Sequence, residues 1–309
     1  MNTYGTRFRV TTYGESHGLA VGSIIDGCPS GLRIDFEAVD RDLARRRTGA
    51  PRQEEDRVEW LSGLRDGVTL GTPITFSIAN RNTRPEDYET LRHAFRPGHA
   101  DYTYHTKYGL RDHRGGGRAS ARETAARVVA GAIAKQVLRH VEFHAKVDQM
   151  GPDLEGDTRG GIVSCRITGL PAGVGEPLFG KLNARLAAAM MSIPSAIGFE
   201  MGAGFAAAMM TGSEYIDRWN PTNNQSNTQA ITQTNHCGGV QGGISNGMPV
   251  EFRVAFHPVA TLPQPVECLT ADGRLETLTV SGRHDRCHIM RLPVIVEAMA
   301  ALTIVNFEF

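Results

Sequence analysis

Six segments rich in Val, Ile, Thr or Phe and bounded by Gly or Pro predict β-strands. They are Phe8–Tyr13, Leu19–Asp26, Val68–Ile78, Gly161–Ile167, Pro249–Phe256 and Leu275–Ser281. These segments follow one another in groups and do not alternate strictly with helices. The pattern therefore favours mixed or antiparallel sheets covered by helices, an α+β fold.

Four other segments place hydrophobic residues at helical spacing. They are Phe36–Arg47, Ser120–His140, Glu176–Ile193 and Pro293–Val305. The second begins with Ser120-x-x-Glu123, which predicts a capping box. The last is apolar on nearly all sides and is therefore predicted to be buried. Residues 201–247 are rich in Gly, Asn, Thr and Gln, and are expected to be mostly loop.

The composition is that of a folded protein with a sizeable core: 40% of its 309 residues are hydrophobic and 21% are charged. Basic and acidic side chains number 33 each, so no overall field indicates nucleic acid or an anionic membrane as a partner. We see neither a linker nor a repeat. The prediction is a single domain over residues 1–309.

The expected location is the cytoplasm. The first residues lack the apolar core of a signal peptide, and no stretch reaches the ~18 apolar residues that a membrane span needs. Five cysteines without C-x-x-C spacing argue against a disulfide framework.

A Gly-rich motif, Gly115-Gly116-Gly117-Arg118-Ala119-Ser120, directly precedes a predicted helix. Backbone N–H groups and guanidinium groups at a helix start can bind an anion. The motif therefore favours an anion site over an ordinary capped helix. Arg45-Arg46-Arg47, at the end of another predicted helix, is either an anion clamp or a set of cations at a helix C-terminus.

A second motif, Tyr13-Gly14-Glu15-Ser16-His17-Gly18, lies between two predicted strands. Adjacent side chains of an extended chain point to opposite faces, so a Ser16–His17 nucleophilic pair is not expected. His17 is better suited as an acid or as a phosphate contact. His140 and His144 have helical spacing and are interpreted as a solvated helix end.

A third motif, Gly282-Arg283-His284-Asp285-Arg286-Cys287-His288, contains several metal-ligating residue types. Its arginines would repel a cation, so a metal is not expected. Asp285, held ionised by the arginines, is a better general base. From residues alone, the sequence predicts a protein that binds a phosphorylated or carboxylated metabolite and transfers protons.

These motifs together resemble the chorismate synthase family. The string from Phe8 to Gly18 is similar to its N-terminal signature, the stretch from Arg96 to Lys135 to its central one, and Gly282–Cys287 to its third. Met191–Pro194 and Asn235–Gly243 also match in order. The resemblance covers essentially the whole chain.

The resemblance implies the last step of the shikimate pathway. 5-Enolpyruvylshikimate 3-phosphate loses phosphate and a C6 proton in an anti 1,4-elimination that gives chorismate. It also implies reduced FMN as the cofactor, NADPH as a candidate reductant, and a homotetramer. Each protomer would hold its helices between two antiparallel sheets.

Roles follow by position from the resemblance. His17 would protonate or stabilise the leaving phosphate, with Ser16 beside it, and His99 would be the proton partner of the flavin. Asp285 would assist removal of the C6 proton with Arg283, also an FMN contact, beside it, and Ser120 is a further catalytic candidate. The substrate would be held by Arg46, Arg96 and either Arg52 or Arg57. FMN would be contacted by Arg118, Ala119, Ser120, Pro194, Ser195, Gly242 and the string His257-Pro258-Val259-Ala260-Thr261.

The chain also departs from the family pattern. The family usually has Lys-Pro and hydroxyl residues where this chain has 257–261, so FMN affinity is expected to be ~10–100-fold lower. The loop after Arg52, the segment between Met150 and Asp157 and the C-terminal tail are short, and Arg286 stands where the family generally has Pro. An alternative is therefore a non-catalytic paralogue that keeps the fold and pocket as a binding or assembly subunit.

Overall fold

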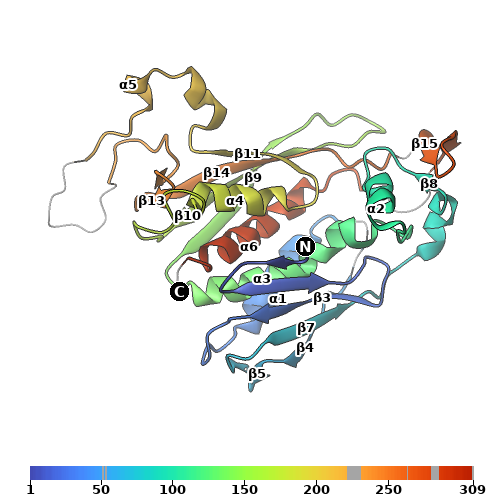
Figure 1. The fold of residues 1–309 in the computed structure, drawn as a ribbon, viewed down its shortest axis with the longest axis horizontal. Helices are drawn as coiled ribbons and strands as arrows, with labels where there is room; N and C mark the ends of the chain where they lie inside the picture. Colours follow the sequence, from blue (N-terminus) through green and yellow to red (C-terminus); the bar gives the residue numbers. More distant parts are fainter. Residues whose placement is uncertain (51, 53, 221–230, 263, 280–284, 308–309) are drawn as a thin grey trace.

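The computed structural model describes residues 1–309 except 51, 53, 221–230, 263, 280–284 and 308–309. Two antiparallel sheets form its outer layers (Figure 1). The first has the order β1-β2-β3-β7-β4. Its strands are β1 (Thr3–Tyr4), β2 (Arg9–Tyr13), β3 (Ala20–Asp26), β7 (Ile74–Ala79) and β4 (Val58–Ser62).

Alternating burial explains how this sheet faces the core. In β7, Ile74, Phe76 and Ile78 are fully buried while the residues between them are not. The predicted strand Val68–Ile78 is wrong in its continuity, because residues 70–73 are not in a strand and separate β7 from β6 (Val68–Thr69). β6 pairs instead with β5 (Leu64–Arg65). Pro73 lacks the N–H that a continuous strand would need.

The second sheet has the order β11-β14-β10-β9. Its strands are β11 (Ala196–Met201), β14 (Val250–Phe256), β10 (Gly161–Thr168) and β9 (Glu142–Met150). The interpretation of His140 and His144 as a helix end is wrong, because His144 lies within β9 opposite Arg166. The alternation of buried Phe143 with exposed neighbours is the strand signal that helical spacing concealed.

Smaller elements complete the chain. β8 (Ala94–Phe95), β15 (Val266–Thr270) and β16 (Leu275–Leu278) form a three-stranded sheet, and β12 (Val240–Gln241) pairs with β13 (Ile244–Ser245). The short helices are α2 (Asp101–Tyr108), which the sequence analysis did not predict, and α5 (Gly212–Tyr215). Five 3-10 turns also occur in the described ranges: Pro85–Leu91, Gly117–Ala119, Ala121–Glu123, Gly204–Met209 and Ile289–Arg291.

Three of the four predicted helices have nearly the predicted bounds: α1 (Phe36–Arg47), α3 (Thr124–Val137) and α6 (Leu292–Ile304). α4 (Leu182–Met191) begins later than predicted, and Phe179 before it is almost fully exposed. The capping box at Ser120 does not form. The Ser120 hydroxyl accepts from the Arg122 N–H, while the Glu123 carboxylate pairs with Arg127 at 2.7 Å.

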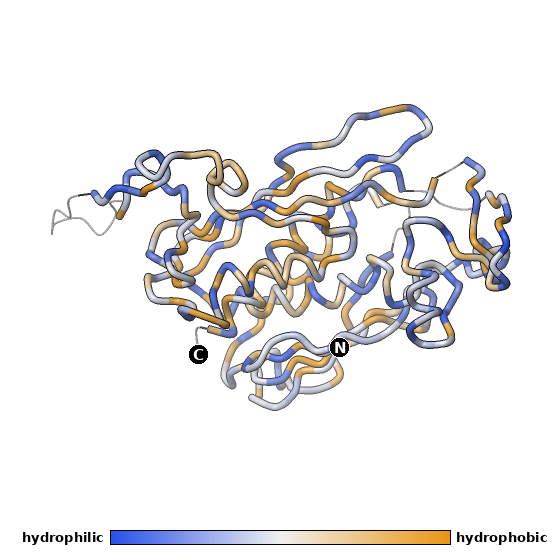
Figure 2. The backbone as a smooth tube through the Cα atoms, turned by 45° about the horizontal axis from the view of Figure 1, so that its top comes forward, coloured by the Kyte–Doolittle hydropathy of each residue, from blue (hydrophilic) through white to orange (hydrophobic). Residues whose placement is uncertain are grey.

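The core lies where the helices meet the sheets. α3 contacts β2 and β3, α6 contacts β9 and β10, and the two helices pack along each other between the sheets (Figure 1). One hydrophobic cluster extends from Phe8 to Val305. Hydrophobic positions concentrate in this central region (Figure 2). The α+β class and the antiparallel sheets are thereby confirmed, as is the burial of α6.

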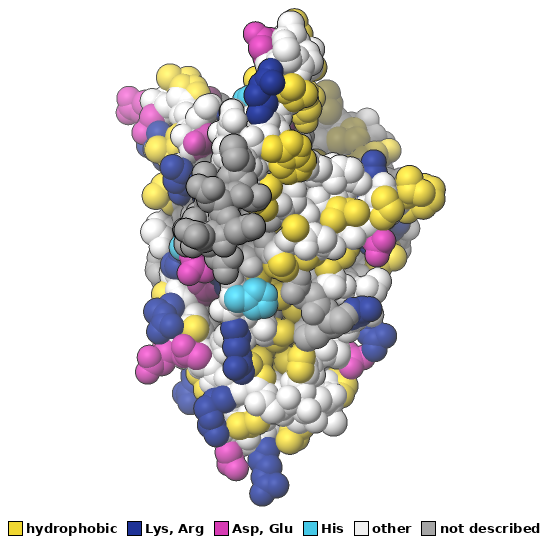
Figure 3. Space-filling view, turned by 90° about the vertical axis from the view of Figure 1, so that its left-hand side faces the viewer, with side chains coloured by type: hydrophobic (Ala, Val, Ile, Leu, Met, Phe, Trp, Pro, Cys, Tyr) yellow, Lys and Arg dark blue, Asp and Glu magenta, His cyan; other side chains and the backbone are white. Residues whose placement is uncertain are grey.

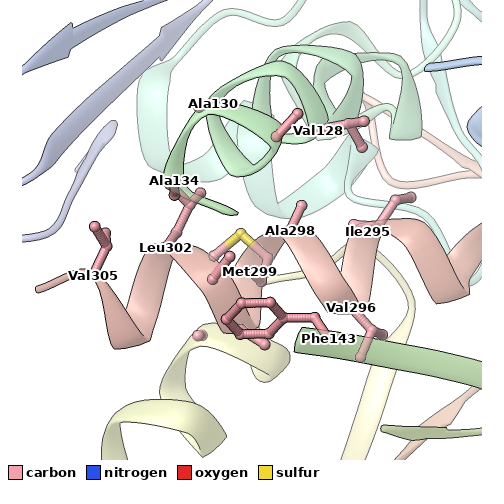
Figure 4. Packing of buried hydrophobic residues seen from close by; sticks show 14 of the residues in the cluster. Val128, Ala130, Ala134, Phe143, Ile295, Val296, Ala298, Met299, Leu302 and Val305 are labelled. Carbon is pink, nitrogen blue, oxygen red and sulfur yellow. The ribbon is translucent and has the colours of Figure 1, made fainter. Parts of the chain in front are cut away.

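The packing of α6 against α3 is close enough to require a glycine (Figure 4). A Cβ added to Gly131 of α3 would lie 2.4 Å from the Cβ of Ala298 and 2.5 Å from its Cα. On another side of α6, the buried carboxylate of Glu297 accepts from Arg45 twice at 2.7 Å and from Lys135 at 2.9 Å. α6 is thus fixed by both apolar packing and a buried ion cluster.

The end of the chain is tied to its beginning. The Asn306 side-chain oxygen accepts from the N–H groups of Thr6, Arg7 and Phe8 at 2.7, 2.9 and 3.2 Å. Its amide nitrogen donates to the carbonyl of Phe8 at 3.1 Å. Within the described part of the chain, no helix is both long and apolar enough to cross a membrane.

Candidate functional site

One large cavity, of about 1260 Å³, collects most of the predicted site residues. All five predicted catalytic residues line it: Ser16, His17, His99, Ser120 and Asp285. So do the predicted substrate residues Arg46, Arg52 and Arg96. The predicted cofactor residues in its wall are Arg118, Ala119, Ser120, Pro194, Ser195, His257, Val259, Ala260 and Thr261. Segments far apart in sequence therefore converge on one space.

Three predicted cofactor residues are not among those that line the cavity. Gly242 occupies the turn between β12 and β13 with a φ of +61°, and Pro258 is not part of the wall. Arg283 lies outside the described residues. For these three residues, the geometry of the cavity does not support a role in binding the cofactor.

The Ser16–His17 motif forms a turn, and the expectation that the two side chains point apart is wrong. The Gly18 N–H donates to the Glu15 carbonyl, and the Ser16 hydroxyl lies 3.0 Å from Nδ1 of His17. Gly115 of the Gly-rich motif packs directly against this pair. A Cβ there would lie 2.5 Å from Nδ1 of His17, and its φ is +65°. The Gly-rich motif thus allows backbone to approach the Ser–His turn.

The three consecutive arginines at the end of α1 have three different partners. Arg45 points to Glu297 on α6, away from the cavity, and Arg47 donates to the backbone carbonyls of Glu54 and Glu55. Arg46 alone lines the cavity. Burial lowers the pKa of Arg46 to about 10, so its guanidinium remains charged at neutral pH. Of the three arginines, Arg46 is therefore the one placed where it could contact an anionic ligand, and the anion clamp stays a prediction for that residue.

Arg52 and Arg57 are also separated by the structure. Arg52 lines the cavity, donates to the Ser16 carbonyl at 2.9 Å and pairs with Glu54. Arg57 lies in a separate small groove with Phe36 and Trp60. Of the two, only Arg52 is placed to face a ligand in the large cavity.

Arg96 is held in the wall by a buried carboxylate. Its Nε and Nη2 donate to Asp101 at 2.8 and 3.0 Å, and Nη2 also donates to the Gly115 carbonyl at 2.8 Å. Burial would raise the pKa of Asp101, but its hydrogen bonds with Arg96 outweigh burial and lower the pKa overall. The pair is therefore ionised at neutral pH, with the guanidinium fixed in orientation.

His99 is poised in its neutral form. Its Nδ1 lies 3.2 Å from the Pro97 carbonyl, and its Nε2 lies 2.9 Å from the Thr261 hydroxyl. Because a carbonyl can only accept, this contact places the proton on Nδ1, and Nε2 then accepts from Thr261. Burial and the nearby Arg96 lower the pKa of His99 below its ordinary 6.5.

Among the wall residues that were not predicted as site residues are Arg291 and His288, the second of which was named only as part of the third motif. His288 Nε2 lies 2.7 Å from the Ser195 hydroxyl, and burial lowers the pKa of His288 to about 4. Arg291 forms an ion pair with Asp285, as the motif analysis had expected of Arg283 or Arg286. Arg291 directly precedes the helix that begins at Leu292, seven residues after Asp285, and this proximity in the chain was the available indication of the pair.

Comparison with known proteins places this chain in a family. The family model described as chorismate synthase matches residues 8–155 and 142–308, which together are nearly the whole chain. The chain belongs to the chorismate synthase family. The predicted family and enzyme class, a carbon–oxygen lyase acting on phosphates, are confirmed with it.

Full-length relatives agree. A chorismate synthase of Christiangramia forsetii is 47% identical, with 99% of this chain and 97% of the relative covered. That of Porphyromonas gingivalis is 46% identical, with 99% and 95% covered. A solved structure titled "Crystal Structure of Chorismate Synthase" matches with a TM-score of 0.77 and 27% identity, covering 98% of this chain and 92% of the other.

The same comparisons bear on the predicted shortening of the chain. The alignment with the Christiangramia forsetii protein extends over 349 positions, so that relative has segments that this chain of 309 residues lacks. The two matched ranges of the family model overlap at 142–155, which includes part of the segment predicted to be short. In the structure, β9 and the turn that follows it occupy this region.

Proposed function

We propose that the large cavity is the active site in which this chain converts 5-enolpyruvylshikimate 3-phosphate to chorismate. The observation that carries the proposal is the convergence of His17, His99 and Asp285 with several arginines on one space, from distant segments of the chain. A substrate with two carboxylates and a phosphate needs fixed cations, and departure of phosphate needs an acid or a cation nearby. Arg46, Arg52 and Arg96 supply the cations.

The chain's own residues suit the two bond-breaking events. His17, beside Ser16, would protonate or stabilise the phosphate as the carbon–oxygen bond breaks. The Asp285 carboxylate, paired with Arg291, would assist the removal of the C6 proton, and the neutral His99 would be the proton partner of the flavin. Ser120 lines the same wall.

The wall also fits a flavin. The cavity exceeds the usual 300–1,000 Å³ of a ligand pocket, which leaves room for a cofactor and a substrate together. Ile193, Pro194, Leu292 and Ile295 give it an apolar surface for a ring system. Arg118 contributes a buried Nη1 that has no hydrogen-bond partner among the residues that the structure describes and lies 3.7 Å from the Glu123 carboxylate, beyond hydrogen-bond distance. Such a donor is suited to a polar group of a cofactor.

We infer that reduced FMN would be held by Arg118, Ala119, Ser120, Pro194, Ser195 and residues 257–261. When bound, reduced FMN supplies electron density and a basic ring nitrogen to a reaction that has no net redox change. In that arrangement the Thr261 hydroxyl, which pairs with His99, would link the cofactor wall to a proton-transferring residue. NADPH as the reductant remains a prediction.

One observation favours the alternative of a non-catalytic binding protein. In the string 257–261, Nδ1 of His257 lies 2.5 Å from the Pro258 carbonyl, and no lysine is present. A permanent cation that the family usually places there is absent. We favour the enzyme because His17, His99 and Asp285 all line the same cavity.

The test is chorismate formation with anaerobically reduced FMN, titrated well above ordinary cofactor levels. We expect turnover that saturates only at high FMN, because the contacts of 257–261 are weakened. Binding of the phosphate ester with no turnover at saturating flavin would refute the enzyme and support the binding protein. Failure to bind the phosphate ester would refute both.

Three broader expectations remain proposals. The single hydrophobic cluster supports one domain over 1–309 and the family's arrangement of helices between two sheets. Copies of the chain would associate as a homotetramer, and exposed hydrophobic residues near α5 support self-association, including Phe205, Met209 and Trp219. Hydrophobic side chains are visible on the upper part of this side of the molecule (Figure 3). The expected location is the cytoplasm.

A further inference from the structure

Asp56 is a fully buried carboxylate directly behind the cavity wall. It precedes β4, its side chain has 0% exposure, and it is not among the residues that line the cavity. Its φ is +53°, in the left-handed region, which costs a non-glycine residue about 1 kcal/mol. A buried charge in a strained backbone persists only where its surroundings hold it.

Two arginines hold Asp56, and they approach it from different sides. Oδ2 lies 3.4 Å from Nη1 of Arg46, and Oδ1 contacts Nη1 of Arg122. Arg122 also donates from Nε to Asn80 at 2.8 Å. Asn80 in turn donates to the carbonyls of Glu15 and Gly18, on either side of the Ser–His turn. The Asp56 carboxylate therefore pairs with Arg122, which is not in the cavity wall, and with Arg46, which lines the cavity.

Among the hydrogen-bond partners of the Arg46 guanidinium that the structure describes, Asp56 is the charged one. The Nε of Arg46 donates to the Thr124 hydroxyl at 3.2 Å, and its Nη2 lies 3.4 Å from the carbonyls of Ala121 and Arg122, the same distance that separates Nη1 from Asp56. The side chain is 12% exposed, on the cavity side. All three guanidinium nitrogens thus contact the protein while the group borders the cavity, and Asp56 supplies the charge that attracts it.

We propose that Asp56 is a positioning residue, which holds the Arg46 guanidinium toward the cavity in the orientation that binds an anionic group of the substrate. The inference rests on the proposed function, since it takes Arg46 as a substrate contact. A guanidinium that is fixed before the ligand arrives loses little conformational entropy on binding. Asp56 itself touches no ligand.

The neighbouring residue on α1 provides a matched control. Arg45 pairs with the buried carboxylate of Glu297 through two bonds of 2.7 Å, a closer pair than that of Arg46 with Asp56 at 3.4 Å, and Arg45 and Glu297 are not in the cavity wall. Asp56→Asn and Glu297→Gln each remove one buried negative charge from an α1 arginine. Both should lower the melting temperature, and only the first should affect substrate binding.

The decisive measurement is the split between KM and kcat. For D56N we expect KM for the phosphate ester to rise roughly 10- to 100-fold, the loss of about one charge-assisted hydrogen bond, with kcat changed far less. Removing a negative charge beside Arg46 would by itself strengthen anion binding and lower KM. A raised KM with little change in kcat therefore reports the orientation of Arg46. An unchanged or lowered KM, or a loss confined to kcat through Arg122, Asn80 and the Ser–His turn, would overturn the inference.

Two further measurements keep the inference open to refutation. If D56N does not fold, Thr124→Val removes the side-chain hydroxyl that accepts from Arg46 Nε and should also raise KM, although by less. An unaffected KM in that variant would overturn the inference. A crystal structure of D56N should show the Arg46 guanidinium turned away from its wild-type position, and an unmoved guanidinium would contradict the role. Wild-type enzyme without turnover would refute the proposed function instead, a separate result.

Discussion

Replacing Gly131 by Ala separates two opposing effects on the stability of the chain. Helix propensity alone predicts that Gly131→Ala stabilises α3 by about 1 kcal/mol. The structure predicts the opposite, because the new Cβ would lie 2.4 Å from the Cβ and 2.5 Å from the Cα of Ala298 on α6. Carbon atoms in ordinary contact lie about 3.5–4.0 Å apart. α3 and α6 would have to separate by roughly an ångström.

The expected magnitude follows from this displacement. Overpacking a tight core typically costs 1–3 kcal/mol, and here the obstacle includes the α6 backbone, which no side-chain rotation can relieve. The cost should exceed the gain in propensity, so we expect G131A to lower the free energy of unfolding by about 2 kcal/mol. Separation of the helices would also open the apolar packing around Met299 and Leu302 (Figure 4).

The assay is urea unfolding at fixed protein concentration, with Gly212→Ala as the control. Gly212 begins α5, and a Cβ added to it meets nothing within 4 Å. G212A should be neutral or slightly stabilising. Adding Ala298→Gly to G131A should restore only part of the loss, because the Cα of Ala298 remains. A G131A protein as stable as wild type would refute the packing argument.

Three other predictions concern the buried ion cluster and the cavity. Burial would raise the pKa of Glu297, but its bonds to Arg45 and Lys135 lower the pKa overall, below 4.5. The contribution of ionised Glu297 to the free energy of unfolding is therefore complete above pH 4.5, and it is lost as the pH falls through the lowered pKa. Urea titrations of wild type and E297Q should thus differ by about 3 kcal/mol at pH 7 and converge in acid. Since the pKa of His99 lies below 6.5, the decline of kcat/KM caused by its protonation should lie below pH 6.5, and a decline centred above that pH would contradict this. H99N should lose roughly 10²–10⁴-fold in kcat. Arg118→Ala should raise the dissociation constant of FMN in a fluorescence titration by roughly 10–100-fold, whereas Arg166→Ala, remote from the cavity, should leave it unchanged.

Local patterns predicted those parts of the molecule that local physics determines. α1 begins and ends where its N-cap Asp35 and its terminal arginines indicated, and the apolar sequence of α6 predicted its burial. β9 escaped prediction because its strand alternation follows a helix without a breaker, so that His140 and His144 fitted helical spacing. Such ambiguities are resolved by pairing with a distant strand, here β10.

The residues of the cavity wall could be predicted where they belong to a sequence motif, and could not be predicted where only tertiary contacts bring them to the cavity. His17, His99 and Arg118 stand in recognisable strings, whereas His288 and Arg291 acquire their positions only when α6 docks. Asp56 is a similar case. Nothing in its sequence neighbourhood distinguishes it from Glu54 or Glu55, and its importance arises from two arginines that are distant in the chain or on another element.

The position of α6 has a consequence for the synthesis of the chain. This helix is in the centre of the core, yet it follows every other described helix along the chain. Until it emerges from the ribosome, the sides of α3 and β9 that pack against it are uncovered, and Asn306 cannot yet bond to residues 6–8. The cavity, whose lining residues extend from Met1 to Ile295, therefore closes only after α6 has been synthesised. A chain truncated before residue 292 would expose its unfinished core to aggregation instead of forming a partial enzyme.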